Sequence, residues 1–232
     1  RQPLAIGDKK TDVVLHLAQS PTQNPEELFD VNVRSTLQLL EWAKRNGVKK
    51  FIYASAGNIY GFSTKRHRET APFNPNNFYA ASKMAAEALC WQYRHCFDIN
   101  IMRLFAPYGE NQQGFRLMPS LFNKIKNQEA VIINNALGNP RINPIYISDL
   151  LTVIKKVISK RGSFKINVAG KRDYSILEIS EITGELLNKK PIYKMTRNKE
   201  IGDLMGDISL MQNILRFSPK ISLVEGLTKF LQ

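Results

Sequence analysis

The sequence predicts an α/β fold in which helices cover both faces of a parallel sheet, followed by a smaller mixed α/β lobe. Short apolar runs rich in β-branched residues alternate with amphipathic stretches through the first half of the chain, and this alternation is typical of strand–helix–strand units with parallel strands. After Gly109 the alternation becomes less regular. We therefore expect residues 1–110 to form the doubly wound part and residues 111–232 to form mostly the second lobe, with some elements returning to the main sheet.

Three apolar runs in the first half have the length and composition of buried parallel strands: residues 12–18 (DVVLHLA), 48–55 and 99–105. Residues 25–47 read as one helix, because Pro25 suits the first helical position and Gly47 suits the end. Prolines and asparagines break regular structure over residues 56–77, and a second helix follows at about 77–96.

The second half predicts shorter elements. We expect strands at residues 130–134 and 164–170, and helices at 115–127, 146–159, 175–188 and 222–231. Ser148 is the expected N-cap of the helix at 146–159. The last two helices each open with a capping box. In this motif the side chain of a serine accepts a hydrogen bond from the backbone N–H of a glutamate three residues later, and the glutamate side chain accepts one from the backbone N–H of the serine. These pairs are Ser175 with Glu178 and Ser222 with Glu225.

The composition is that of a soluble globular protein, with 43% hydrophobic and 23% charged residues among 232. Cys90 and Cys96 offer no disulfide framework, which favours a reducing, cytoplasmic setting. No apolar run approaches the roughly 20 residues that span a membrane, and the first ten residues lack the apolar core of a secretory signal. The cysteines and the histidines form no metal-ligand spacing, so we expect no metal site.

The formal net charge of +13 predicts an anionic partner, such as a nucleic acid, a membrane surface or a phosphorylated small molecule. The basic residues are scattered along the chain, however, and no RNA-recognition signature accompanies them. This pattern argues against a nucleic-acid partner. An ordinary solvated surface and a small anionic substrate both remain open.

A tyrosine and a lysine occupy one face at the start of the helix at 77–96. Tyr79 stands four residues before Lys83, and residues at this spacing share a helix face. An ammonium beside a phenol favours the phenolate, which lowers a tyrosine pKa from about 10 toward working pH and suits it to general acid–base chemistry. The same spacing also arises by chance on amphipathic helices, so the pair alone leaves the question open.

The sequence segments before and after this pair match the segments of a known protein family, in the same order. They resemble the extended short-chain dehydrogenase/reductase family, in particular its NAD-dependent sugar-nucleotide epimerases and dehydratases, whose fold is a Rossmann-like doubly wound sheet with a substrate lobe. The matching segments are DVVLHLA, NVRSTLQLLEWA, FIYASAGNIYG, NPNNFYAASKMAAE, IMRLFAPYG, NPIYISDL, INVAGKRDYSILEISEITGELL and GDISLMQNILRFSPKISLVEGL. The resemblance therefore covers nearly the whole chain and makes residues 1–110 a partial dinucleotide-binding domain.

The resemblance implies a role for each matching residue. Tyr79 would exchange a proton with a sugar hydroxyl while a hydride moves to or from NAD, and Lys83 would support it and bind the nicotinamide ribose; NADP is left open. Positions that would line the cofactor are Leu17, Ala18, Gln19, Asn32, Ser55, Tyr79, Lys83 and Phe105, and positions that would meet the nucleotide sugar are Ala106 and Arg141. The helices that carry Trp42 and Trp91 would pair across a two-fold axis, which implies a homodimer.

The front of the chain departs from this family. The family begins with a Gly-rich turn that cradles the pyrophosphate, and none of the 13 glycines forms that pattern. The resemblance places the first residue just before the fourth strand, so about 60 residues, two strand–helix units, are expected to be absent. On this interpretation the chain is a fragment or a gene that has lost its front, and its NAD site is incomplete.

The loop before the catalytic helix departs as well. Ala56 stands where the family carries a catalytic Ser or Thr, and Ser55 beside it takes that role only if the chain turns, because neighbouring strand residues face opposite sides. Gly57 and Asn58 replace the Asp and Glu of members that eliminate water, and Ala106 replaces an asparagine that often touches the sugar. The sequence therefore predicts an NAD-dependent nucleotide-sugar epimerase or related oxidoreductase with Tyr79, Lys83 and Ser55 as catalytic residues. The alternative is a catalytically weakened relative that binds a nucleotide or a partner.

Overall fold

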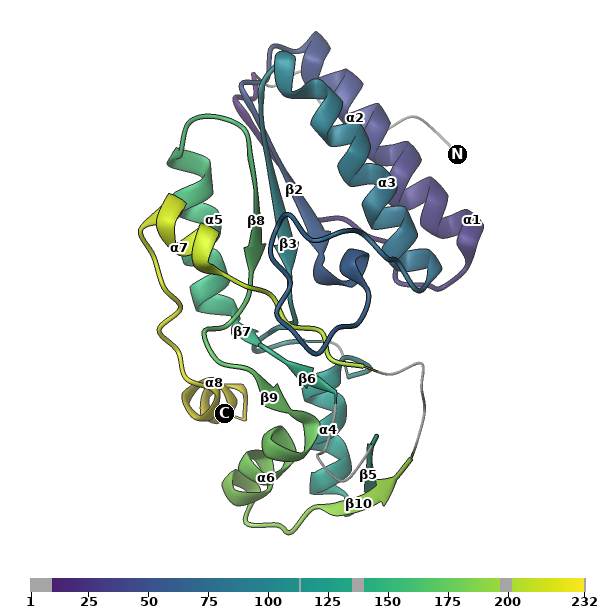
Figure 1. Cartoon of the computed structure of the whole chain (residues 1–232), viewed down its shortest axis with the longest axis vertical. Helices are drawn as coiled ribbons and strands as arrows, with labels where there is room; N and C mark the ends of the chain where they lie inside the picture. Colours follow the sequence, from purple (N-terminus) through teal and green to yellow (C-terminus); the bar gives the residue numbers. More distant parts are fainter. Residues whose placement is uncertain (1–9, 113, 135–139, 197–201, 232) are drawn as a thin grey trace. The chain divides into compact units, whose positions relative to one another are not determined.

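The computed structural model describes residues 10–112, 114–134, 140–196 and 202–231, which fold into two compact units (Figure 1). The first unit is built from the chain up to Gly61, from Glu69–Leu104 and from Ile154–Asn167. The second is built from Phe62–Arg68, Phe105–Val153 and the chain from Val168 onward. Each unit thus combines segments that are far apart in the sequence.

The first unit is organised around a four-stranded sheet with the order β1 (Val13–His16), β2 (Lys50–Ala56), β3 (Asp98–Leu104) and β8 (Phe164–Val168). β2 pairs in parallel with β1 on one side and with β3 on the other. Every residue of β2 is buried, as the continuous apolar run predicts for a central parallel strand. The α/β fold with a Rossmann-like parallel sheet is confirmed.

Two helices cover one face of this sheet, α2 (Ser35–Arg45) and α3 (Phe78–Gln92) (Figure 1). Their apolar faces meet β2 and β3 in a core of residues Leu40, Ala43, Val48, Phe51, Tyr53, Ala86, Cys90, Phe97, Ile99 and Ile101. The short helices η2 (Gly57–Tyr60) and η3 (Tyr93–His95) flank α3 in the chain. Asn77 caps α3 by accepting a hydrogen bond from the backbone of Ala80, which fixes where the helix begins.

The helix expected over residues 25–47 is divided into three parts. It begins at α1 (Pro25–Leu28), continues as the π-helical segment η1 (Phe29–Arg34) and ends as α2. Pro25 stands at the first turn as predicted, and Gly47 follows the end of α2 with φ +65°. A π-helical turn adds a residue to the helical repeat and is often found at functional sites. Here it contains Asn32, one of the predicted cofactor residues.

The other face of the sheet is met by the last turns of α5 (Ile147–Ser159). Lys50, at the start of β2, reaches the end of this helix and donates hydrogen bonds to the carbonyl oxygens of Val157, at 3.0 Å, and of Lys160. A cation at a helix C-terminus satisfies carbonyls that have no partner in the helix and interacts favourably with the helix dipole. Lys50 thereby ties the sheet to the helix on this face.

Within the described residues, the second unit is a mixed α/β structure of short strands and four complete helices. Its strands pair as β4 (Pro107–Tyr108) with β7 (Ile145–Tyr146), β5 (Ala130–Ile133) with β10 (Ile192–Met195), and β6 (Arg141–Ile142) with β9 (Tyr174–Ser175). Its helices are α4 (Leu117–Lys126), α6 (Ile176–Leu187), α7 (Ser209–Leu215) and α8 (Leu223–Phe230). They enclose a core that includes Tyr108, Leu121, Ile125, Tyr146, Ile179 and Leu227.

The predicted helix signals have three outcomes. The capping box of Ser175 and Glu178 is confirmed in both directions. Ser222 accepts the predicted bond from Glu225, whose carboxylate meets Lys229. The prediction that Ser148 caps α5 is wrong, because that helix already begins at Ile147 and the carbonyl of Ser148 accepts an intrahelical bond from Thr152. Across the described ranges, no helix combines the length and the apolar character needed to cross a membrane.

Candidate active site

Tyr79 and Lys83 lie in the first two turns of α3, directly after the Asn77 cap. α3 runs along the sheet, and its first two turns lie near the carboxyl end of β2, where Lys83 meets Ala54. The carboxyl ends of the strands form the edge where parallel α/β sheets bind their ligands. Tyr79 is half-buried, and Lys83 is only 2% exposed. The predicted pair is therefore present on one helix face, with a partly accessible phenol and a buried ammonium.

Lys83 is held against β2 by two contacts. Its Nζ donates a hydrogen bond to the carbonyl oxygen of Ala54 at 3.0 Å and lies 5.0 Å from the centroid of the Tyr53 ring. Burial lowers the pKa of Lys83 to about 8, because the charged form loses its hydration. An amine with this pKa can change its charge near neutral pH, which suits a group that supports proton transfer.

Tyr79 contacts the segment that follows β1. Its hydroxyl donates to the side-chain oxygen of Gln19 at 2.9 Å. The same segment is fixed through Asn32, whose Oδ1 accepts from the backbone of Ser20 and whose Nδ2 donates to Ser82. Ser82 in turn donates to the backbone carbonyl of Tyr79. Gln19, Asn32, Tyr79 and Ser82 therefore belong to one connected group, while Leu17 and Ala18 lie exposed beside it in the chain.

Ser55 faces α3 from β2. Its hydroxyl donates to a carboxylate oxygen of Glu87 at 3.0 Å, one helical turn beyond Lys83. Ala56 is extended and buried, and strand alternation turns it to the opposite face from Ser55. The hydroxyl of Ser55 thus has a partner within the helix. Its role as a catalytic residue stays a prediction.

Glu87 belongs to a buried polar network that no sequence motif indicated. Both of its oxygens accept hydrogen bonds from Arg103 on β3, and the two side chains are each 1% exposed. The guanidinium also donates to the hydroxyl of Tyr60 and, at 3.0 Å, to the carbonyl of Glu69. A fully satisfied ion pair of this kind fixes α3, β3 and the loop before α3 relative to one another.

The residues present fit the nicotinamide ribose of NAD. An ammonium has three N–H donors, and within the described residues Lys83 makes one hydrogen bond, to a carbonyl. Two donors therefore remain for the hydroxyl groups of a ribose. Leu17 and Ala18, which directly follow β1 in the chain, are exposed. Among the described residues, no group of His, Cys, Asp and Glu side chains could hold a metal ion.

The other predicted site residues lie in the second unit. Phe105 is buried, and its backbone N–H donates to Val168 at 2.9 Å. Ala106 has a φ of +41°, a left-handed conformation that alanine seldom adopts. Its carbonyl accepts a hydrogen bond from Ile145. Both residues follow the carboxyl end of β3 in the chain, and their roles toward cofactor and substrate stay predictions.

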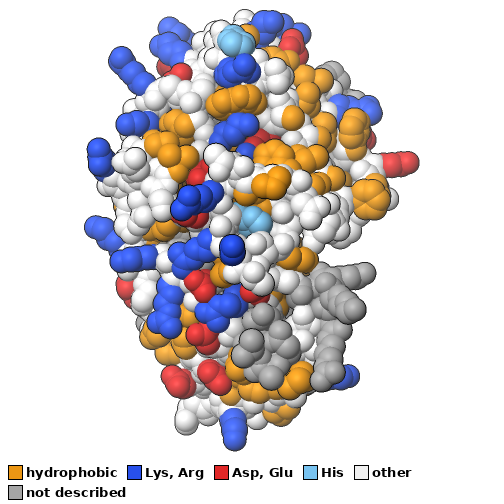
Figure 2. Space-filling model, in the orientation of Figure 1, with side chains coloured by type: hydrophobic (Ala, Val, Ile, Leu, Met, Phe, Trp, Pro, Cys, Tyr) orange, Lys and Arg blue, Asp and Glu red, His pale blue; other side chains and the backbone are white. Residues whose placement is uncertain are grey.

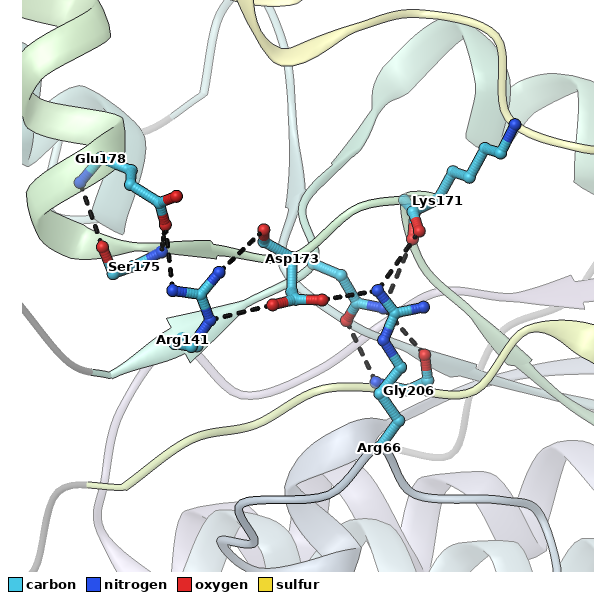
Figure 3. A network of polar contacts seen from close by, with 9 residues as sticks. Arg66, Arg141, Lys171, Asp173, Ser175, Glu178 and Gly206 are labelled. Atoms are coloured by element: carbon cyan, nitrogen blue, oxygen red, sulfur yellow. Dashed lines mark hydrogen bonds and ion pairs between the residues drawn. The ribbon is translucent and has the colours of Figure 1, made fainter. Parts of the chain in front are cut away.

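Arg141 lies in a chain of alternating charges (Figure 3). Its guanidinium donates to Asp173 at 2.9 Å and pairs with Glu178 at 3.1 Å, and Asp173 also accepts from Arg66 at 2.5 Å. The two arginines hold the pKa of Asp173 below its usual value, against the effect of burial. A nucleotide phosphate at Arg141 would have to share this guanidinium with two carboxylates.

The basic side chains are dispersed over the face of the molecule that Figure 2 draws, with acidic side chains between them. Several of them form ion pairs, among them Arg66 and Arg141 with Asp173, and Arg68 with Asp207 at 3.3 Å. His67 lies within the basic run KRHRE and is nevertheless buried, because its backbone forms an isolated β-bridge with Gly206.

The chain was compared with known protein families and with known proteins. The family described as the NAD dependent epimerase/dehydratase family matches residues 4–169. A UDP-glucuronate 4-epimerase of Thermodesulfobacterium geofontis is 33% identical over 229 residues, which are 93% of this chain and 70% of that protein. A UDP-glucuronic acid decarboxylase 3 of Arabidopsis thaliana is 27% identical, over 97% of this chain and 70% of that protein.

The fold is similar to solved structures along nearly all of the chain. A UDP-glucuronic acid 4-epimerase from Bacillus cereus in complex with NAD superposes with a TM-score of 0.87 at 26% identity, covering 99% of this chain and 77% of that chain. The same enzyme in complex with UDP-glucuronic acid and NAD gives a TM-score of 0.86 at 26% identity, covering 94% and 74%.

Proposed function

The chain belongs to the NAD dependent epimerase/dehydratase family, a family of NAD-dependent enzymes, and from this premise we propose that it acts on a nucleotide-linked sugar as an epimerase or related oxidoreductase, with Tyr79 as the acid/base. The observation that carries the proposal is the Tyr79–Lys83 pair, in which a buried lysine with a pKa of about 8 stands one turn from a partly accessible phenol. UDP-glucuronate is the first substrate to test, since two similar proteins are named for it.

In this proposal NAD, when bound, would supply a reversible hydride acceptor for a sugar carbon. The proton of the hydroxyl on that carbon passes to the phenolate oxygen of Tyr79, so that the C–O bond becomes a carbonyl and Tyr79 becomes neutral. Lys83 stabilises the phenolate and binds the nicotinamide ribose. Leu17, Ala18, Gln19 and Asn32 line the cofactor from the end of β1 and from η1, together with Ser55 and Phe105.

Most of the proposed cofactor residues belong to the first unit, whereas Phe105 and the proposed nucleotide-sugar residues belong to the second. Ala106 and Arg141 are the substrate residues, and Arg141 would exchange part of its contact with Asp173 or Glu178 for a phosphate. We propose a cytoplasmic homodimer that pairs through the helices of Trp42 and Trp91, without a nucleic-acid partner. The dispersed basic side chains, several of which are paired with carboxylates, support this last point.

A second function is favoured by the surroundings of Ser55. Ala56 has no hydroxyl, and the hydroxyl of Ser55 donates to Glu87, so neither position supplies an evident hydrogen-bond donor to a reacting sugar oxygen. Loss of one such donor typically costs about 10²–10³-fold in rate. The alternative is therefore a catalytically weakened member that binds NAD or a nucleotide sugar without appreciable turnover.

One experiment separates the two functions. The 232-residue protein is incubated with NAD and UDP-glucuronate, and the sugar is followed by proton NMR while reduced nicotinamide is followed by absorbance. For an enzyme, Tyr79→Phe should lower turnover by at least about 10²-fold, whereas the control Tyr174→Phe, a half-buried tyrosine of the second unit, should not. Saturable binding by calorimetry without turnover in the unmodified protein would favour the weakened relative.

A further inference from the structure

The hydroxyl of Tyr79 already has a specific partner in the protein. It donates to Oε1 of Gln19 at 2.9 Å, across a separation of 60 residues in the chain. Tyr79 and Gln19 are both half-buried, so the contact lies where a ligand can reach it. A side chain that holds the hydroxyl of a candidate acid/base influences both where its oxygen lies and when it ionises.

The position of Gln19 is fixed independently of this contact. The backbone of the next residue, Ser20, donates to Asn32 at 3.0 Å, and Asn32 donates to Ser82 at 2.9 Å. Ser82 then donates to the backbone carbonyl of Tyr79 at 2.8 Å. Asn32 is 1% exposed and Ser82 8% exposed, so these bonds are shielded from water and hold their geometry. Tyr79 is therefore joined to the same segment twice, through its backbone and through its hydroxyl.

We propose that Gln19 is a positioning residue for Tyr79, whose hydroxyl it holds through the amide carbonyl until a substrate hydroxyl takes that place. The proposal rests on the proposed function, in which Tyr79 exchanges a proton with the sugar. A carbonyl oxygen accepts from the neutral phenol but cannot donate to the phenolate. With its Oε1 facing the phenol, as it lies here, Gln19 therefore favours the protonated tyrosine in the absence of a substrate.

A carboxylate at position 19 would strengthen this preference. Like the amide carbonyl it accepts from the phenol, and its charge in addition opposes a phenolate beside it. Alanine would remove the preference altogether. Gln19→Glu should thus raise the pKa of Tyr79 and Gln19→Ala should lower it. Substitutions of a merely structural residue would not shift this pKa in opposite directions.

Other titratable groups lie on the elements packed around α3 and do not change among these variants. Those nearest the site include Lys83 and Glu87 on α3 itself, His16 on β1, Glu26 and Glu27 on α1, Asp30 and Arg34 on η1, Tyr53 on β2, Tyr60 on η2 and Arg103 on β3; the groups of α2 and η3 include Glu41, Lys44, Arg45 and Tyr93. Glu27 accepts from Ser20, and Asp30 pairs with Arg34 at 3.1 Å. Differences between matched variants therefore report the residue at position 19.

The test follows the ionisation of Tyr79 without any substrate. The full chain is labelled with ¹³C at tyrosine Cζ, the Tyr79 signal is assigned by its loss in Tyr79→Phe, and the signal is titrated with pH. Gln19→Ala should lower the titration midpoint by about half a pH unit, and Gln19→Glu should raise it by at least as much. The control Gln23→Ala, at an exposed position four residues later, should leave it unchanged.

A second arm measures how turnover of UDP-glucuronate depends on pH. The rising limb of the profile should move in the same direction as the NMR midpoint in each Gln19 variant. If neither variant moves the NMR midpoint while both remain folded, Gln19 does not hold Tyr79 and the inference is wrong. If the NMR midpoints move as expected but no protein turns over the sugar, the inference stands and the proposed enzymatic function fails.

Discussion

Ala106 has a backbone conformation that its side chain opposes. Its φ of +41° falls in the left-handed region, where a Cβ is crowded by the following carbonyl at a cost of about 1–2 kcal/mol. Glycine lacks the Cβ, and asparagine tolerates this region better than alanine does. The asparagine that the family resemblance places here therefore has a conformational reason in addition to its contact with the sugar.

The first prediction is that Ala106→Gly and Ala106→Asn both increase the free energy of unfolding, by about 0.5–1 kcal/mol, because each relieves the left-handed strain. Urea denaturation checks this. Ala130→Gly is the matched control: Ala130 lies in an exposed position on β5 at ordinary φ, so glycine there should lower the free energy of unfolding. If UDP-glucuronate binds, Asn should also improve its affinity, and Gly should not.

At the scale of the element, α3 is held in place by an ion pair in which both side chains are buried. Glu87 on α3 receives hydrogen bonds from Arg103 on β3 and from Ser55 on β2, and Lys165 approaches it at 3.9 Å. The Arg103 guanidinium also lies 5.1 Å from the Tyr60 ring and 4.9 Å from the Phe73 ring. The helix that carries Tyr79 and Lys83 is thus attached to two strands and to the preceding loop through one carboxylate.

The second prediction is that Glu87→Gln lowers the free energy of unfolding by about 3–5 kcal/mol, because it leaves the charge of Arg103 buried without its counter-ion. Chemical denaturation measures the change. Glu41→Gln, which alters a half-buried acid that bonds Tyr93 at the far end of α3, should cost much less. The double variant Glu87→Leu with Arg103→Met removes both charges and should recover part of the loss. If the double variant is no more stable than Glu87→Gln, the unpaired charge of Arg103 is not the cause of the loss, and the hydrogen bonds of the pair themselves stabilise the fold.

The sequence predicted the elements whose signal is local. The strands β1, β2 and β3 come from continuous apolar runs, and the start of α6 comes from its capping box. The two-residue strands β4, β6, β7 and β9 were missed because only a partner far along the chain defines them. The π-helical segment η1 was missed because one added residue barely disturbs the apolar repeat of the surrounding helix.

In the candidate site, too, the sequence predicted the features that depend on local spacing and missed the contacts between distant residues. The Tyr79–Lys83 pair is visible because its spacing is local, whereas the contacts of Tyr79 with Gln19 and of Arg103 with Glu69 join residues 60 and 34 positions apart. A usable signal was nevertheless present. Arg103 is a charged residue inside the apolar run IMRLF, and such a residue in a buried strand requires an acidic partner. Glu87, one turn beyond Lys83 on the same helix face, was the available candidate.

At the scale of the whole molecule, burial of basic groups in the first unit makes stability depend on pH. Burial, and to a smaller extent the charge of Lys83, lowers the pKa of His16 to about 4. Its Nε2 lies 2.8 Å from the hydroxyl of Thr36, so the neutral ring has a partner. Burial also lowers the pKa of Lys83 to about 8. Both groups bind a proton more readily in the unfolded chain than in the folded one, over different pH ranges.

The third prediction concerns the acid side of this dependence. An unfolded histidine takes up a proton near pH 6.5, whereas His16 in the folded protein stays neutral down to about pH 4. Its contribution to stability is therefore complete above about pH 6.5 and is lost progressively as the pH falls toward 4. Between pH 7 and pH 5 the unmodified protein should lose on the order of 1–2 kcal/mol of unfolding free energy through this one group.

His16→Gln, which keeps a polar side chain near Thr36, should lose correspondingly less over that interval. His95→Gln, at an exposed position that ends η3, should leave the pH dependence as it is. Urea unfolding at the two pH values measures all three proteins, and equal losses in the unmodified protein and His16→Gln would show that the acid sensitivity comes from the carboxylates and not from the buried histidine.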